Sequence, residues 1–182
     1  DVTIIDRSLP RLRQLDELFE GRVHTLASTL ESIETEVFAA DAVIGAVLVP
    51  GASAPKLVTR DMLKEMKKGA VLVDVAIDQG GCFETSYPTT HAEPTYEIDG
   101  IIHYCVANMP GAVPVTSAQA LNNATLPFVL KLAHKGLAAL DDDKHLAAGL
   151  NVRAGRITHP AVASSLGFDR LGEARPFVLA AE

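Results

Sequence analysis

The sequence predicts an α/β protein with a doubly wound, Rossmann-type parallel sheet. Strand-like and helix-like segments alternate from Val2 to Val106, which is the order of successive βα units. The stretch Ala42–Val49 is apolar throughout, as in a parallel sheet that is covered on both faces. Beyond the last expected strand, a long apolar-striped segment predicts helix. We therefore expect a sheet domain over residues 1–113 and a helical C-terminal segment over residues 114–182.

The first strand and helix are expected at the start of the chain. The β-branched run Val2–Ile5 predicts a strand, and it ends in an acid, Asp6. Ser8 fits the N-cap of a helix that has Pro10 in its first turn and leucines on one face. Gly21 then ends this helix.

The other elements follow from the same signals. Short apolar runs predict strands, apolar residues at helical spacing predict helices, and Thr59 caps a helix that closes at Gly69. In chain order we expect a strand at Val23–Leu26, a helix at Leu30–Phe38, a strand at Ala42–Val49, a helix at Thr59–Gly69, a strand at Ala70–Ile77, a loop rich in Pro, Thr and His, a strand at Ile101–Val106, a helix at Thr116–Leu140 that is broken or kinked near Pro127, and a shorter element at Asn151–Leu166.

Composition argues against several classes of partner. The net charge of −7 disfavours nucleic acid and anionic membranes, because both require a basic face. The longest apolar window, Ala42–Pro50, is far shorter than the roughly 18 residues of a membrane span. The opening residues lack the features of a signal peptide, and the two cysteines, Cys82 and Cys105, lack the spacing of a zinc site. We expect a cytoplasmic protein with no metal site and no disulfide.

Asp78 is the first candidate for a functional residue. It follows the apolar strand Ala70–Ile77 and leads directly into Gly80 and Gly81. Ligands of open α/β sheets bind just beyond the carboxyl ends of the strands. The alternative is that Asp78 only stabilises the turn. The neighbouring Cys82 is open to two interpretations, a reactive thiol or a buried structural one, and base rates favour the buried one.

Three further strand ends carry small or polar residues. The loop of small residues in Gly45–Pro55 would let a ligand lie against the backbone, although a tight turn would explain it too. Asn108 follows the last strand, and Pro110 and Pro114 come after it. Asp6 ends the first strand, where dinucleotide folds place an acid that binds ribose hydroxyls. The glycine fingerprint G-x-G-x-x-G that usually accompanies such an acid does not occur in the chain.

Several segments closely resemble the L-alanine dehydrogenase family. They are Ile44–Gly51, Ala54–Thr59, Asp74–Glu84, Cys105–Pro110 and Leu121–Pro127, and the likeness covers essentially the whole chain up to a variable tail. The resemblance implies an NAD-dependent enzyme that interconverts L-alanine with pyruvate and ammonia. It also implies a homo-oligomer, a hexamer in this family.

The resemblance implies roles for individual residues. Asp78 would be catalytic, holding and deprotonating the water that attacks the imine, and Asn108 would help to place the substrate. Asp6 would bind the adenosine ribose, with Arg11 and Ser28 beside the adenine end. The full implied cofactor-binding set is Asp6, Arg11, Ser28, Val47, Leu48, Val75, Ala76, Ile77, Asp78, Val106, Ala107, Asn108 and Met109.

The chain departs from the family pattern at its start. The family's catalytic His and the Lys and Arg that bind the substrate carboxylate belong to an earlier domain, and none of the six histidines matches. In the strand order 3-2-1-4-5-6, the first strand lies between the second and the fourth, here Val2–Ile5 and Ala42–Val49. We therefore expect that this first strand is missing from the chain, that the C-terminal segment returns to the substrate domain, and that these residues alone are not stably folded.

Two alternative functions follow from the same residues. One is the nucleotide-binding part of a proton-translocating NAD(P) transhydrogenase, a related family that typically lacks an acid at the position of Asp78. The other is a non-catalytic fragment that binds a dinucleotide.

Overall fold

Two units make up the part of the chain that the computed structural model describes, which is residues 1–49 and 53–168. The first unit comprises Asp1–Leu48 and Ala54–Met109, and the second comprises Val49–Ser53 and the chain from Pro110 onward. Every residue of the implied cofactor set lies in the first unit. The assignment of the two units to a cofactor domain and a substrate domain remains a prediction.

The first unit begins with a parallel βαβ unit. Strand β1 (Thr3–Asp6) pairs in parallel with β2 (His24–Ala27), and helix α1 (Leu9–Phe19) connects them. The Ser8 side chain caps α1 by accepting a hydrogen bond from the backbone N–H of Arg11, as the sequence predicts. Helix α2 (Leu30–Ala39) follows β2, and the side chains of Thr29 and Ser32 form a reciprocal cap at its start.

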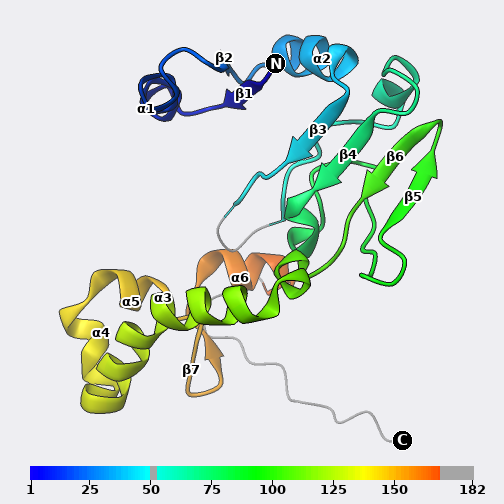
Figure 1. Ribbon diagram of the computed structural model, residues 1–182. Helices are drawn as coiled ribbons and strands as arrows, with labels where there is room; N and C mark the ends of the chain where they lie inside the picture. Colours follow the sequence, from blue (N-terminus) through cyan, green and yellow to red (C-terminus); the bar gives the residue numbers. More distant parts are fainter. Residues whose placement is uncertain (50–52, 169–182) are drawn as a thin grey trace, which may run out of the picture. The chain divides into compact units, whose positions relative to one another are not determined.

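A four-stranded sheet follows in the same unit. Its strand order is β3 (Ala42–Gly45), β4 (Val71–Asp74), β6 (Ile101–Tyr104), β5 (Thr95–Ile98). Strands β3, β4 and β6 are parallel, so their arrowheads lie at the same end of the sheet (Figure 1). The core beside this sheet includes Leu63, Leu72, Phe83 and Ile101, all at most 1% exposed.

Three strands are shorter than the sequence predicts. Strand β6 ends at Tyr104 rather than Val106. Strand β3 ends at Gly45 rather than Val49, and β4 ends at Asp74 rather than Ile77. The chain after Asp74 turns into a short 3₁₀ helix, η2 (Val75–Gln79). Val75, Ala76 and Ile77 continue the apolar run of the strand, and an apolar run alone does not show where strand geometry ends.

The helix expected at Thr59–Gly69 is also shorter. Only one 3₁₀ turn forms there, η1 (Asp61–Lys64), and the Thr59 side chain accepts from the N–H of Met62 at 3.4 Å. Met62 and Leu63 are buried in the core, as is Met66 beyond the turn. Burial of these side chains therefore explains the apolar pattern without a regular helix.

The loop expected between Gly80 and Ile101 contains a hairpin. Strand β5 pairs antiparallel with β6 across the two residues Asp99 and Gly100. Both have positive φ, 53° and 78°, which is the geometry of a type I′ turn. An Asp-Gly pair between two runs of β-branched and aromatic residues is a strong hairpin signal. The sequence therefore contains a signal for β5, although a loop was expected there.

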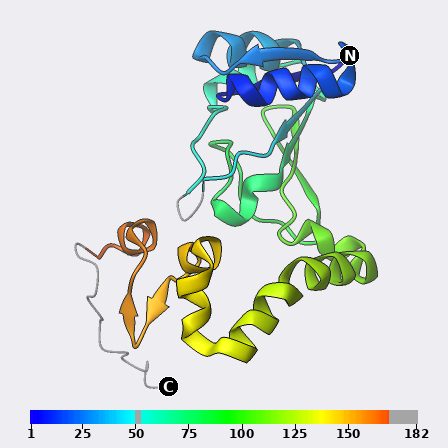
Figure 2. The ribbon, with the colours of Figure 1, turned by 90° about the vertical axis from the view of Figure 1, so that its left-hand side faces the viewer.

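The second unit is built from helices and a small hairpin. Helix α3 (Pro114–Lys135) is one continuous helix (Figure 2) that contains Pro127, so it is not broken at that residue, and the other half of the expectation, a kink near Pro127, stays a prediction. The last residue of α3 is Lys135, five residues before the predicted end, and Gly136 is its C-cap. The remaining elements are η3 (Met109–Ala112) at the junction, η4 (Gly136–Ala138), α4 (Ala139–Asp142), α5 (Lys144–Ala148), β7 (Val152–Arg153), β8 (Arg156–Ile157) and α6 (Pro160–Ser165). Within the described ranges, no helix combines the length and apolarity needed to cross a bilayer.

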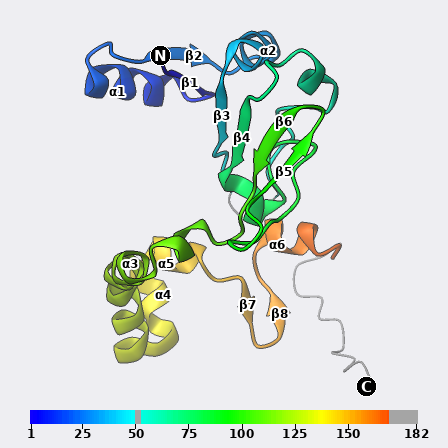
Figure 3. The ribbon, with the colours of Figure 1, turned by 45° about the vertical axis from the view of Figure 1, so that its right-hand side comes forward.

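Among the described residues, β1 and β3 each have one strand neighbour. Strand β1 pairs with β2 and β3 pairs with β4, so the described part of the first unit holds two separate sheets (Figure 3). On β3, the side chain of Ile44 is 69% exposed although it is apolar. These are the two strands whose shared neighbour the sequence analysis expects to be missing, and that expectation stays a prediction.

Candidate functional site

Three loops lie at the carboxyl ends of the parallel strands β3, β4 and β6. The first continues from β3 through Leu48, the second is η2, and the third follows β6 through Met109. Leu48 is 72% exposed and Val75 is 49% exposed, while Ala76 and Ile77 are buried. Because parallel strands end at one edge of a sheet, these loops share the edge where α/β proteins bind ligands.

Asp78 lies in the exposed part of η2, where the chain turns. The N–H groups of Gly80 and Gly81 donate to the carbonyls of Ile77 at 2.9 Å and Ala76 at 3.0 Å. Gly80 and Gly81 have φ of 89° and 72°, a conformation that strongly favours glycine. The Asp78 carboxylate is therefore held on a tight, specifically folded turn at the carboxyl end of β4.

The buried carboxylate of Asp74 organises the chain after this turn. Its Oδ2 accepts from the N–H of Cys82 at 2.9 Å, from the N–H of Phe83 at 3.3 Å and from the Ser86 hydroxyl at 2.5 Å. The residue is fully buried. A buried carboxylate requires such donors, because burial without them is costly. The sequence analysis gave Asp74 no role, although an acid inside an apolar run is a signal of this kind.

Cys82 is a structural thiol. It is completely buried, and its Sγ donates to Asp74 Oδ1 at 3.5 Å. Burial, together with the nearby Asp74 carboxylate, raises the pKa of the Cys82 thiol to about 12. The nucleophilic thiolate is therefore scarce at neutral pH. Of the two interpretations of Cys82, the structure favours the buried one.

The loop that carries Asn108 is held by the segment around Thr89. The Thr89 N–H donates to the Cys105 carbonyl at 2.9 Å, and the Ala107 N–H donates to the Thr89 carbonyl at 3.1 Å. Asn108 has a φ of 56°, which Asn tolerates better than most residues. Its carbonyl accepts from Nε2 of His91 at 3.0 Å. The sequence analysis did not anticipate this contact of His91.

Asp6 and Ser28 are joined at the carboxyl ends of β1 and β2. The Ser28 N–H donates to the Asp6 carbonyl at 3.0 Å, and Asp6 Oδ1 accepts from the Ser8 N–H at 2.7 Å. The Asp6 carboxylate can accept further hydrogen bonds from a ligand. Arg11 lies in the first turn of α1, where its Nη1 donates to Gln14 Oε1 at 3.3 Å. Asp6 and Ser28 thus form one local cluster, with Arg11 in the first turn of the helix that follows Asp6, and the loops of the four-stranded sheet form another.

His103 has a structural role. It is fully buried, its ring stacks on Tyr96 with centroids 4.8 Å apart, and Tyr96 stacks on Tyr87 at 3.8 Å. Burial lowers the pKa of His103, which favours the neutral ring. Nδ1 lies 3.0 Å from the Ile101 carbonyl and so donates, which leaves Nε2 to accept from the Thr85 hydroxyl at 2.8 Å. Among the described residues, no group of His, Cys, Asp or Glu is arranged to hold a metal ion.

Alternating strands and helices, a parallel sheet and polar loops at its carboxyl edge define an α/β protein of the nucleotide-binding kind. The family model for the C-terminal domain of alanine dehydrogenase/PNT matches residues 1–160. The chain belongs to this alanine dehydrogenase/PNT C-terminal domain family.

Individual relatives agree with this assignment. The alanine dehydrogenase of Halomonas elongata is 64% identical over 170 residues, which cover 93% of this chain and 46% of that protein. The alanine dehydrogenase of Staphylococcus saprophyticus is 58% identical over 168 residues, covering 91% of this chain and 45% of that protein. The chain thus spans about half the length of the curated relatives it matches.

Solved structures show the same relationship. A structure of L-alanine dehydrogenase is 55% identical with a TM-score of 0.78, and the match covers 92% of this chain and 46% of that one. A transhydrogenase structure from Sinorhizobium meliloti is 24% identical with a TM-score of 0.66, covering 88% of this chain and 42% of that one. The transhydrogenase likeness supports the fold alone.

Proposed function

We propose that this chain forms the cofactor-binding half of an NAD-dependent L-alanine dehydrogenase, which converts L-alanine to pyruvate and ammonia and catalyses the reverse reaction. The observation that carries the proposal is the exposed carboxylate of Asp78 on a tight turn at the carboxyl end of β4. Relatives named alanine dehydrogenase that are 58% and 64% identical to this chain support it.

The residues at the two clusters fit a nicotinamide dinucleotide. Asp6 offers a carboxylate for ribose hydroxyls, with Arg11 and Ser28 beside it. Leu48 and Val75 present exposed apolar side chains at the sheet edge, as expected for residues that contact a flat ring. The remaining residues of the implied set complete the proposed cofactor site: Val47, Ala76, Ile77, Asp78, Val106, Ala107, Asn108 and Met109.

The chemistry of alanine oxidation requires a carboxylate at such a site. The bound cofactor supplies a hydride acceptor, and oxidation of the substrate leaves an imine that water must attack. Asp78 would hold and deprotonate this water and would stabilise the positive charge on the imine nitrogen. Asn108 would help to position the reacting carbon. The groups that bind the substrate carboxylate would come from the part of the enzyme that relatives have and this chain lacks.

The proposal extends to the assembly and location of the enzyme. Residues 1–113 would form the cofactor domain, and residues 114–182 would return to the substrate domain. By resemblance to its family, the enzyme would be a cytoplasmic homo-hexamer. The alternative of a transhydrogenase nucleotide-binding part is disfavoured, because that family typically lacks an acid at the position of Asp78.

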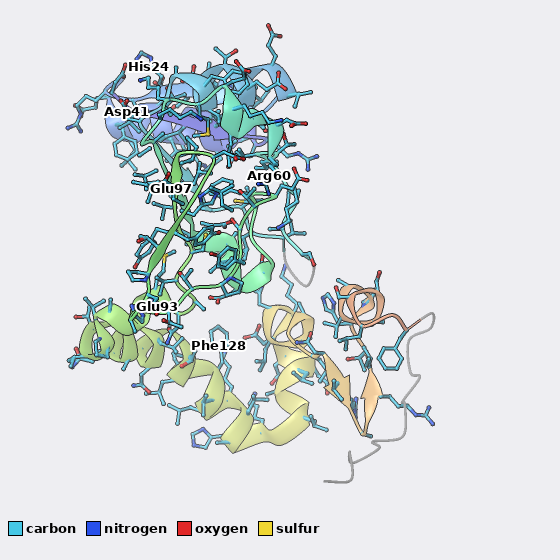
Figure 4. The ribbon with its side chains drawn as sticks, turned by 90° about the vertical axis from the view of Figure 1, so that its right-hand side faces the viewer. His24, Asp41, Arg60, Glu93, Glu97 and Phe128 are labelled. Atoms are coloured by element: carbon cyan, nitrogen blue, oxygen red, sulfur yellow. The ribbon has the colours of Figure 1, made fainter. Side chains whose placement is uncertain are left out.

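The test is Asp78→Asn in the complete enzyme. We expect turnover of L-alanine to fall about 100-fold or more, the scale of a lost general base, with little change in NAD affinity. Asp41→Asn is the matched control. Asp41 is also an exposed acid, but it lies just before β3, at the amino end of that strand and away from the carboxyl ends that carry the site loops (Figure 4). Turnover of Asp78→Asn close to that of the unmodified enzyme would reduce Asp78 to a turn residue and remove the proposed mechanism.

A further inference from the structure

A second segment runs along the turn that carries Asp78. The Ala54 N–H donates to the Gln79 carbonyl at 3.0 Å, and the Leu57 N–H donates to the Cys82 carbonyl at 2.7 Å. The Glu84 N–H donates to the Val58 carbonyl at 2.9 Å, next to a parallel bridge between Val58 and Phe83. Residues 54–58 therefore form a continuous backbone support for residues 79–84.

Lys56 is the side chain that joins this support to the glycine turn. Its Nζ donates to the carbonyls of Gly80 at 2.5 Å, Gly81 at 2.8 Å and Phe83 at 3.2 Å. An ammonium group has three N–H donors, so these three carbonyls use all of them. Hydrogen bonds from a charged donor are roughly twice as strong as neutral ones.

The same turn is also held by a group of the opposite charge. Asp74 accepts from the N–H groups of Cys82 and Phe83, while Lys56 donates to the carbonyls of Gly80, Gly81 and Phe83. The Lys56 ammonium group thus holds backbone carbonyls, and the Asp74 carboxylate holds backbone N–H groups, within residues 80–83. Glycines lose more conformational freedom on folding than other residues, so a turn with two of them depends on such contacts.

We propose that Lys56 is a positioning residue for Asp78, with Asp74 as its buried counterpart. The proposal rests on the proposed function of Asp78. The Asp78 side chain is exposed, so core packing does not fix its carboxylate, and its place is set by the backbone of η2 and the glycine turn. Lys56 fixes that backbone. Its ammonium group is hydrogen-bonded to three backbone carbonyls and takes no part in the reaction itself.

The experiment uses the complete enzyme and compares Lys56→Met with Lys68→Met. Lys68 is the matched control, because its Nζ also donates to a backbone carbonyl, that of Asp99 in the hairpin turn, at 2.7 Å. We expect Lys56→Met to lower kcat for L-alanine oxidation about 10- to 100-fold, the cost of a displaced catalytic group, with little change in the Kd of NAD. Lys68→Met should leave kcat unchanged.

Two further measurements separate positioning from a general loss of stability. If Lys56 acts through Asp78, the double variant of Lys56→Met and Asp78→Asn should be no slower than Asp78→Asn alone. Hydrogen exchange of peptides that cover residues 79–84 should be faster in Lys56→Met than in Lys68→Met. If Lys56→Met does not fold, Lys56→Gln is measured in the same way.

Two results would overturn the proposal. Unchanged exchange over residues 79–84 in Lys56→Met would show that Lys56 does not hold the turn, whatever the activity. If the fold-losses of kcat from the two substitutions multiply in the double variant, Lys56 does not act through Asp78. If Asp78→Asn itself turns over normally, the proposed function fails, and the exchange measurement still decides whether Lys56 fixes the turn.

Discussion

The Asp6 carboxylate, at the end of β1, bears on the choice between NAD and NADP. An acid at this place accepts hydrogen bonds from a ribose 2′-hydroxyl and repels a 2′-phosphate. We expect kcat/KM of the complete enzyme to be at least about 10-fold higher with NAD than with NADP, and Asp6→Asn to narrow the difference. The neighbouring Arg7 is the competing influence, because an Arg at this place can bind a phosphate. Comparable efficiency with both cofactors would contradict the role given to Asp6.

Gly80 and Gly81 offer a matched pair of substitutions within the Asp78 turn. Both have positive φ, so alanine at either position strains the backbone by about 1–2 kcal/mol. A Cβ on Gly80 would meet open space, whereas a Cβ on Gly81 would lie 2.7 Å from Asp74 Oδ2 and 2.9 Å from Ser86 Cβ. We expect Gly81→Ala to lower the free energy of unfolding by about 1–3 kcal/mol more than Gly80→Ala. Urea denaturation of the two variants of the complete enzyme measures this, and equal losses would show that Asp74 and Ser86 move aside easily.

At the scale of elements, Asp143 links α3 to α5. Its Oδ1 caps α5 by accepting from the N–H groups of His145 and Leu146, and its Oδ2 accepts from the Lys131 ammonium at 2.6 Å. The hydrogen bond from Lys131 is the main cause that lowers the pKa of Asp143 to about 2 in the folded protein. Because the folded pKa is below the unfolded one of about 3.9, the stabilisation is fully present above pH 4 and is lost as the pH falls toward 2.

This link predicts a difference in acid sensitivity. Asp143→Asn keeps an N-cap acceptor but loses the ion pair, so its Tm should fall less between pH 4 and pH 2 than the Tm of the unmodified protein. Thermal unfolding of the complete enzyme and of its Asp143→Asn variant, monitored by circular dichroism over this pH range, makes the comparison. Parallel pH profiles for the two proteins would show that the Lys131 contact does not contribute.

Comparison of the predicted and observed elements shows which features of the fold the sequence patterns predict. The positions of β1, β2, β3, β4, β6, α1 and α2 are predicted to within a few residues, because capping residues and apolar runs are local signals. Strand length is overestimated at Ala70–Ile77, where Val75, Ala76 and Ile77 are apolar but helical. The residues proposed to bind the cofactor follow from family resemblance. Lys56 and Asp74 were missed as support for the Asp78 turn, because their contacts join residues 8 to 27 positions apart and leave no periodic pattern.

At the scale of the whole molecule, we predict that these 182 residues alone do not form a stable, active protein. Strands β1 and β3 each leave one side without a strand partner in the described structure, and such an open edge of backbone N–H and C=O groups favours pairing with another strand. Helix α3 exposes Leu121, Phe128 and Val129 by 65%, 41% and 55%, which fits a helix that packs against another part of a larger protein.

The test is to express residues 1–182 alone and to measure cooperative unfolding, NAD binding and alanine oxidation. We expect weak or absent cooperativity and no turnover, because the proposed first strand and the groups that bind the substrate carboxylate are lacking. The complete enzyme under the same conditions is the control. A cooperatively folded product that oxidises alanine would show that the assignment of β1 and β3 as neighbours of a missing strand is wrong.

The stack of Tyr87, Tyr96 and His103 has a spectroscopic consequence. The chain has no tryptophan, and its three tyrosines, Tyr87, Tyr96 and Tyr104, all belong to the first unit. Near-ultraviolet circular dichroism and intrinsic fluorescence from this chain therefore report on the β5–β6 hairpin and its surroundings. The second unit contributes very little to either signal. A single tryptophan placed at Phe128 would give the second unit its own signal, so that the unfolding of the two units can be followed separately in one sample.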